Sequence, residues 1–150
     1  MEARIIGLGN RLRGDDAAGP LAAERAAAGV LPPGVEAVEA GGDPFSLLEL
    51  ITTCRRAVIV DAAEMGAAPG TVRVLRGAEI PAAWGFHTSL HAVDLLDVLA
   101  MARKLGRAAA VSLVAIQPGA CGFGDALTPV IEGKIEEITA IALKEALNEA

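Results

Sequence analysis

The side chains best suited to chemistry in this sequence are three carboxylates and an imidazole: Asp15, Asp16, Asp61 and His91. The first two follow an apolar segment and a glycine-rich turn, and Asp61 closes a second apolar segment. If the two segments are neighbouring strands of an open α/β sheet, the carboxylates converge where such sheets bind ligands. Carboxylates with an imidazole suit Ni, Zn, Fe(II) or Mn rather than Cu(I) or a structural zinc site.

The two histidines, His87 and His91, precede or open a helix that the pattern predicts over 90–104. The first turn of a helix disfavours imidazolium, and a metal requires the neutral imidazole. The alternative is that His91 caps the helix or faces solvent, and that Asp15 and Asp16 only shape their turn. Asp61 is harder to explain in this way, because a charge after a buried strand is costly unless it is paired.

The glycine-rich turn over 7–20 would also suit a phosphate-binding loop, but two features argue against it. The dinucleotide fingerprint requires a glycine at the position of Leu12, and no Gly-Lys-Ser/Thr follows. Two carboxylates next to a phosphate would repel it, at a cost of about 4 kcal/mol for each carboxylate–phosphate pair at an effective dielectric constant of about 20. The turn therefore predicts a cation as its ligand, and a nucleotide-binding domain is a distant alternative.

Four other residues could take part in chemistry. Glu64 is either a solvated charge or a second base, and Asp94 either orients His91 or faces water, as we expect. Cys54 and Cys121 have no CxxC spacing and are expected to be free, inert thiols in a reducing compartment.

The composition indicates one soluble domain over 1–150, with 53% hydrophobic and 3% aromatic residues. The net charge of −6 disfavours nucleic acid or an anionic membrane as a partner. No segment approaches the ~20 apolar residues of a membrane span, and no signal-peptide pattern is visible. We therefore expect a cytoplasmic protein.

The elements that must position these residues alternate between strand and helix. Strands are predicted over 3–8, 35–40, 57–61, 71–75 and 109–116, helices over 19–28, 44–53, 90–104 and from Pro129 onward, and loops over 77–89 and 118–126. Leu90, Val93, Leu96 and Leu99 form the expected apolar stripe of the third helix, and Thr128 the expected N-cap of the last. The fold class is α/β: a three-layer sandwich of about five mostly parallel strands with helices on both faces, and 71–75 as an antiparallel edge.

Taken together, the motifs resemble those of the nickel–iron hydrogenase maturation endopeptidases over nearly the whole chain. The shared features are Gly7-Leu8-Gly9-Asn10, Asp15-Asp16 with Gly19, Gly41-Gly42, Val58-Ile59-Val60-Asp61-Ala62, Thr88-Ser89-Leu90-His91, Gln117-Pro118 and Leu127-Thr128-Pro129. One departure is Ala17, where the family often has glycine.

The resemblance implies a protease that removes the C-terminal extension of a hydrogenase large-subunit precursor. It implies that Asp16, Asp61 and His91 bind metal and catalyse, that Asp15 holds the turn, and that His87 has no assigned role. In the family, nickel is thought to arrive with the substrate, bound to the precursor's cysteines. Other divalent metals such as Zn or Cd are expected to substitute for nickel at the site. An open site with three ligands leaves room for water or substrate.

Two alternatives from other classes stay open at the level of the sequence. One is a conventional hydrolase that carries its own Zn or Mn, and the other is a non-enzymatic metal-binding module. No HExxH helix supplies a general base, so the group that activates water is either Asp16 or Asp61.

Overall fold

The structure, a computed structural model, describes residues 1–41, 43–82, 87–88, 92–107 and 109–147, with the backbone alone over the described part of 81–94. The elements in chain order are β1 (Ala3–Leu8), the 3₁₀ turn η1 (Gly14–Ala17), α1 (Ala18–Ala28), β2 (Val35–Ala40), α2 (Pro44–Thr52), β3 (Arg56–Glu64), β4 (Val72–Arg76), α3 (Glu79–Ala82), β5 (His87–Thr88), α4 (Ala92–Lys104), β6 (Ala110–Ile116), α5 (Pro129–Glu132) and α6 (Ile135–Leu147). The predicted alternation of strands and helices is therefore confirmed.

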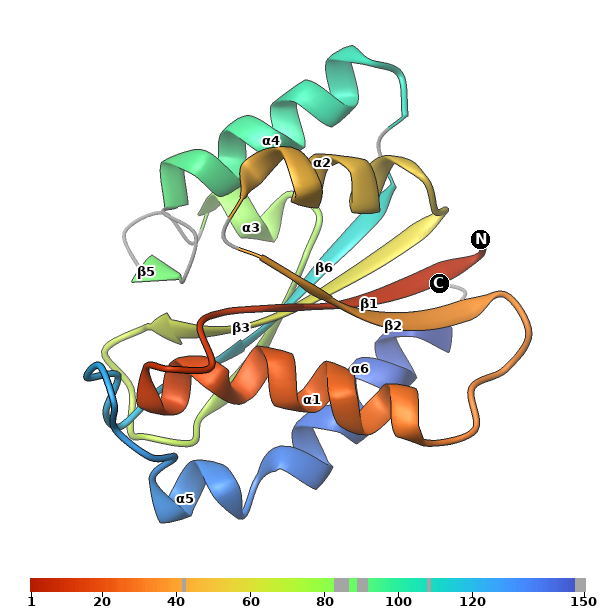
Figure 1. Ribbon diagram of the computed structural model, residues 1–150. Helices are drawn as coiled ribbons and strands as arrows, with labels where there is room; N and C mark the ends of the chain where they lie inside the picture. The colour runs from red at the N-terminus through yellow and green to blue at the C-terminus, as the bar shows by residue number, and fades with distance from the viewer. Residues whose placement is uncertain (42, 83–86, 89–91, 108, 148–150) are drawn as a thin grey trace.

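One sheet forms the centre of the molecule, with the strand order β2-β1-β3-β6-β4. The pairs β1–β2, β1–β3 and β3–β6 are parallel, and β4 runs antiparallel to β6 at the edge, as predicted. The short β5 pairs antiparallel with the end of β3. Figure 1 shows α2, α3 and α4 on one face of the sheet and α1, α5 and α6 on the other.

Two apolar layers separate the sheet from its helices, because alternate strand residues point to opposite faces. The layer under α2 and α4 contains Ile6, Leu8, Leu47, Ile51, Ile59, Leu95, Val98, Leu99 and Leu113. The layer under α1 and α6 contains Ile5, Ala22, Val58, Val60, Val114, Ile131, Ile135, Ile138 and Ala142. None of the described helices is long and apolar enough to cross a membrane.

Several predicted boundaries were wrong in detail. β3 continues through Glu64 because β6 pairs with it as far as Ala62 and β5 pairs with the last two residues. The predicted loop over 77–89 contains α3 and β5, and Ile80 of α3 is buried in the core. The last helix is divided into α5 and α6 around Gly133, a residue that weakens helix interiors.

The apolar stripe of α4 also differs from the prediction. The buried residues are Leu95, Val98, Leu99 and Ala102, whereas Leu96 is only half-buried at the border of the core. Leu90 and the side chain of Val93 lie outside the described residues. The face of α4 that packs on the sheet is therefore rotated relative to the predicted stripe, with Leu99 common to both.

Candidate active site

The strand order reverses between β1 and β3, and this creates a topological switch point at the carboxyl edge of the sheet. β2 pairs with β1 on one side, and β3 pairs with β1 on the other. Open α/β sheets bind their ligands at such a point. The condition that the sequence prediction required, a first and third strand side by side, is confirmed.

Two glycines allow the turn after β1 to lie against the strands. A Cβ on Gly19 would clash with the carbonyl oxygen of Val60, and a Cβ on Gly9 would clash with that of Asp16. Gly9 also has a φ of +146°, which L side chains rarely adopt. Since η1 contacts β3, Asp16 is held next to the strand that carries Asp61.

Asp15 is completely buried and surrounded by hydrogen-bond donors. Its Oδ1 accepts from the Thr128 N–H at 2.8 Å, and its Oδ2 accepts from the Thr128 hydroxyl at 2.7 Å and from the N–H groups of Gly119 and Ala120 at 2.8 and 3.1 Å. Burial raises the pKa of Asp15, but the hydrogen bonds from Thr128, Ala120 and Gly119 outweigh burial and leave the pKa below its ordinary value.

This arrangement confirms that Asp15 holds the turn. It also corrects the role of Thr128, which occupies the N-cap position of α5 but makes no side-chain capping bond there. The hydroxyl instead donates to the carboxylate of Asp15, and a hydrogen bond to a charged acceptor is stronger than one between neutral groups.

Asp16 differs from its neighbour in exposure and in partners. It is half-buried, and its Oδ2 accepts from the backbone N–H of Asn10 at 2.8 Å. This hydrogen bond orients the carboxylate within the glycine-rich turn, and the partial exposure leaves it within reach of solvent at the carboxyl edge.

Asp61 is fully buried and lies inside β3, three residues before the end of the strand. The prediction that it closes the strand was wrong, since β3 extends beyond it. The last pair between β1 and β3 joins Gly7 and Val60, so Asp61 follows directly after the segment of β3 that pairs with β1. Ile59 and Ala63 lie in the layer under α2 and α4, and the alternation of a strand places Asp61 on the same face.

The histidines are placed less completely. His91 lies outside the described residues, so its predicted role as a ligand stays a prediction. The next residue, Ala92, begins α4, which covers the face of the sheet that Asp61 shares. The backbone of His87 belongs to β5 and pairs with Glu64 at the end of β3.

Gln117, at the carboxyl end of β6, organises the connection that follows β3. Its Oε1 accepts from the N–H groups of Met65 and Ala67 at 2.7 and 3.3 Å, and its Nε2 donates to both carboxylate oxygens of Glu64 at 3.0 Å. Glu64 is exposed, as expected for a solvated charge, but it belongs to a strand and not to a loop. No role of its own was predicted for Gln117, although the Gln117-Pro118 motif was a signal in the sequence.

The two cysteines are free and half-buried. Burial raises the pKa of the Cys54 thiol. Burial also raises the pKa of the Cys121 thiol, and the negative charges of Asp16 and Asp15 raise it further. Both thiols therefore stay protonated at neutral pH and are poor nucleophiles. The side chain of Asp94 lies outside the described part of the chain.

The donor set fits a divalent metal in part. Within the described residues, no three His, Cys, Asp or Glu side chains gather as a metal site. Asp16 and Asp61 supply two oxygen donors from adjoining elements at one edge, and His91 would be the third. An oxygen-rich set of this kind suits Ni, Zn, Fe(II) or Mn.

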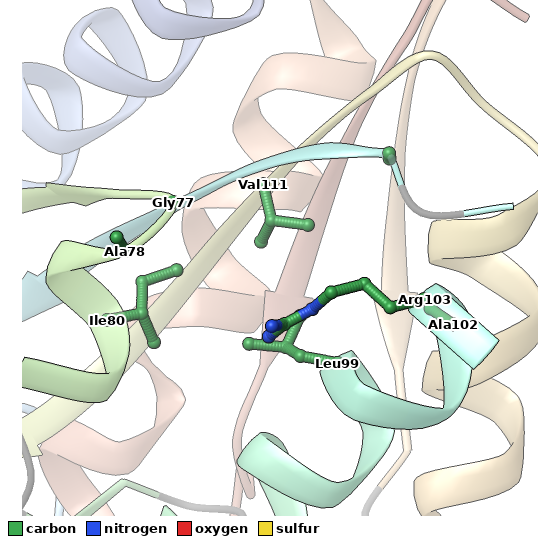
Figure 2. Close-up of a pocket in the computed structure, with 8 residues that line it drawn as sticks. Gly77, Ala78, Ile80, Leu99, Ala102, Arg103 and Val111 are labelled. Atoms are coloured by element: carbon green, nitrogen blue, oxygen red, sulfur yellow. The ribbon is translucent and has the colours of Figure 1, made fainter. Parts of the chain in front are cut away.

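A separate cavity of about 420 Å³ lies away from this edge, between α3, α4 and the beginning of β6. Figure 2 shows its mostly apolar lining, including Ile80, Leu99 and Val111, with the guanidinium of Arg103 extending across it. None of the described residues that line the cavity is an Asp, Glu, His or Cys, the types of side chain that bind metal. This cavity therefore adds no carboxylate to the candidate site at the switch point.

The fold and the site define a small three-layer α/β protein with two carboxylates at the switch point of a mostly parallel sheet. The sequence matches the family model HycI, hydrogenase maturation protease, over residues 21–145. The chain belongs to this family and is a peptide hydrolase. The matched region contains Asp61 and His91 and begins after Asp16.

Similar proteins extend the match to the whole chain. The hydrogenase 2 maturation protease of Escherichia coli K12 is 33% identical, with 100% of this chain and 95% of the relative covered. The hydrogenase 3 maturation protease of the same organism is 34% identical, over 89% of this chain and 84% of the relative. The solved structure of the hydrogenase maturating endopeptidase HybD from E. coli superposes with a TM-score of 0.84 at 31% identity, over 94% of this chain and 89% of that chain.

Proposed function

We propose that this protein removes the C-terminal extension of a hydrogenase large-subunit precursor that already carries nickel. Membership of the hydrogenase maturation proteases supports the precursor as the substrate. The observation that carries the proposal is the position of two carboxylates, on η1 and on β3, at the switch point of the sheet. Nickel belongs to the substrate in this proposal, and Zn or Cd would substitute for it.

The roles of the carboxylates follow from their burial. Asp61 is fully buried on a rigid central strand and is suited to fixed contact with the metal. Asp16 is half-buried, so water can reach it. In the proposed reaction Asp16, Asp61 and His91 contact the metal. Asp16 then accepts a proton from the water that attacks the scissile carbonyl, and the proton passes to the leaving amine.

The test compares precursor with and without nickel. Wild-type protein is expected to shorten only the nickel-loaded precursor, as measured by mass spectrometry of its C-terminus. Asp16→Asn and Asp61→Asn are each expected to lower the cleavage rate by at least about 100-fold. Asp97→Asn, an exposed carboxylate on α4, is the control. Cleavage of nickel-free precursor at an equal rate would contradict the proposal.

Metal retention and precursor cleavage by the wild-type protein distinguish this proposal from a conventional hydrolase and from a metal-binding module. A conventional hydrolase would retain its own Zn or Mn after dialysis against a mild chelator, whereas a protease that reads the substrate's nickel would retain none. A metal-binding module would bind metal and cleave no precursor.

We also propose a cytoplasmic location. Both cysteines are free, and they lie in different connections of the chain, Cys54 between α2 and β3 and Cys121 between β6 and α5, which suits a reducing compartment. Fractionation of cells that produce the protein tests this proposal.

A further inference from the structure

Large apolar side chains are exposed at the edge of the sheet that carries the candidate site. Phe45 is 79% exposed, Phe123 is 77% exposed and Leu12 is 62% exposed. Phenylalanine is usually buried, and the chain contains only three. Both phenylalanines whose side chains the structure describes are therefore on the surface.

These three side chains, here called the apolar rim, follow three different strands. Leu12 follows β1, Phe45 lies in the first turn of α2 after β2, and Phe123 lies in the loop after β6. β1, β2, β3 and β6 are parallel, so these segments meet at the carboxyl edge with Asp16. Figure 1 shows the turn after β1, the start of α2 and the loop before α5 at the left side of the molecule.

Two members of the apolar rim are held on loops that are hydrogen-bonded to each other. The N–H of Gly124 donates to the carbonyl oxygen of Leu12 at 2.7 Å, and the N–H of Gly14 donates to that of Asp125 at 3.1 Å. These contacts join the backbone next to Phe123 to the backbone of Leu12. The same loops supply the donors to Asp15, so the apolar rim is fixed relative to the carboxylate site.

Phe45 lies on the opposite side of the sheet from the loop that carries Phe123. Its N–H donates to Oδ1 of Asp43 at 3.0 Å, which fixes the first turn of α2. α2 covers one face of the sheet, and the loop with Phe123 leads into α5 on the other face. The apolar rim therefore flanks the carboxylates from both helical layers.

We propose that the apolar rim binds an extended segment of the protein substrate, with apolar side chains on both sides of the cleaved bond. The inference rests on the proposed function, since it takes the protein substrate as the occupant. A peptide hydrolase must hold its substrate's chain across the reacting groups, and rigidly presented apolar side chains do so at low entropic cost. At this edge the carboxylates Asp16, Glu39, Asp43, Glu64 and Asp125 outnumber the two cations that flank Leu12, Arg11 and Arg13. This acidic balance disfavours an anionic lipid surface as the occupant.

The experiment replaces each member of the apolar rim by serine and measures cleavage of nickel-loaded precursor. Leu12→Ser, Phe45→Ser and Phe123→Ser are each expected to raise KM about 5- to 20-fold with kcat within 2-fold, because they remove binding that is equal in the ground and transition states. The melting temperature is expected to stay unchanged, since all three side chains are exposed.

Two exposed apolar residues at the opposite edge serve as controls. Val30, after α1, is 101% exposed, and Leu105, after α4, is 54% exposed. Val30→Ser and Leu105→Ser are expected to leave KM unchanged. An unchanged KM in the rim variants, or a rise of the same size in the controls, would overturn the proposal.

Failure of the proposed function would be recognised separately. If the wild-type protein cleaves no precursor, the proposed function fails. Titration calorimetry of nickel-loaded precursor with wild-type protein and with the rim variants then decides about the apolar rim alone. A dissociation constant raised about 5- to 20-fold in the variants supports it, and equal binding, or no binding to wild-type protein, overturns it.

Discussion

At the scale of single residues, two adjacent carboxylates have opposite environments. Asp15 is buried and accepts four hydrogen bonds from Gly119, Ala120 and Thr128, whereas Asp16 is half-buried and accepts from Asn10. A buried carboxylate with both oxygens held by protein donors is a structural group. A carboxylate that water can reach is suited to catalysis.

A pair of matched substitutions should separate these roles. Asp15→Asn is expected to lower the free energy of unfolding by about 3 kcal/mol, because its amide N–H₂ would face a buried N–H donor. Asp16→Asn is expected to change stability by less than about 1 kcal/mol while abolishing cleavage. Urea denaturation and precursor cleavage measure the two effects. Equal destabilisation by both variants would contradict the assignment.

A second prediction at this scale concerns the two histidines. His91→Ala is expected to abolish cleavage, because the resemblance assigns the metal-binding imidazole to this residue. His87→Ala is expected to retain at least about a third of the wild-type rate, since its backbone pairs with Glu64 at the end of β3 and no role is assigned to its side chain. The measurement is the cleavage rate of each variant at saturating nickel-loaded precursor. If His87→Ala abolished cleavage and His91→Ala retained it, the metal-binding residue would be His87.

The sequence could identify Asp15 and Asp16 as special but could not show the partners of Asp15. Those partners, at 119, 120 and 128, are more than a hundred residues away along the chain, and no local pattern connects them to the first turn. Gln117 illustrates the same limit, because its side chain contacts Glu64 at the end of β3 and Met65 and Ala67 in the connection that follows, about fifty residues earlier in the chain.

At the scale of elements, the strands that are buried on both faces were predictable. β1 and β6 consist of nearly continuous apolar residues, which is typical of central parallel strands. The extension of β3 over Ala62, Ala63 and Glu64 was not predictable, because it depends on pairing with β6 and β5 and not on strand propensity. Asp61 therefore lies deeper within a strand than its sequence position indicates.

The contact between α1 and the switch point gives a prediction at this scale. Gly19→Ala is expected to destabilise the protein by about 1 to 3 kcal/mol and to slow cleavage, because the added methyl would clash with the carbonyl oxygen of Val60 and displace η1 from β3. Gly29→Ala, at the other end of α1, meets no atom closer than 3.6 Å and is expected to retain stability and activity. Thermal unfolding and cleavage rates check both; a tolerated Gly19→Ala would contradict the close approach.

At the scale of the whole molecule, two buried carboxylates, Asp15 and Glu145, form hydrogen bonds that connect segments at opposite edges of the sheet. Asp15 joins the first turn to the start of α5 at the carboxyl edge. Glu145 of α6 is 5% exposed and accepts from the Ser112 hydroxyl at 2.9 Å and from the Arg76 guanidinium. The hydrogen bond from Arg76 is the main cause that lowers the pKa of Glu145, and it outweighs burial.

These lowered pKa values predict how stability depends on pH. A carboxyl group whose pKa is lower in the folded state stabilises the protein above its unfolded pKa, and this contribution is lost as the pH falls through the folded pKa. The free energy of unfolding should therefore decrease as the pH falls below about 4.5, near the ordinary pKa values of Asp and Glu. Asp15→Asn and Glu145→Gln should each be less stable at pH 7 and lose less stability on acidification.

Glu39→Gln is the matched control, because Glu39 also has a lowered pKa, through its hydrogen bond with Arg11, but is exposed to solvent. Solvent screening limits the contribution of such a pair to less than about 1 kcal/mol, so this variant should follow the wild-type pH curve.

Asp15 and Glu145 lie at opposite ends of β6, about 20 Å apart by the rise of a strand. Their effects on the free energy of unfolding should therefore add within about 0.5 kcal/mol in the double variant. Urea denaturation from pH 3 to pH 7 compares the wild type with the three single variants and the double variant. Stability curves parallel to wild type for both Asp15→Asn and Glu145→Gln would refute the role of these two carboxylates in the loss of stability at acid pH.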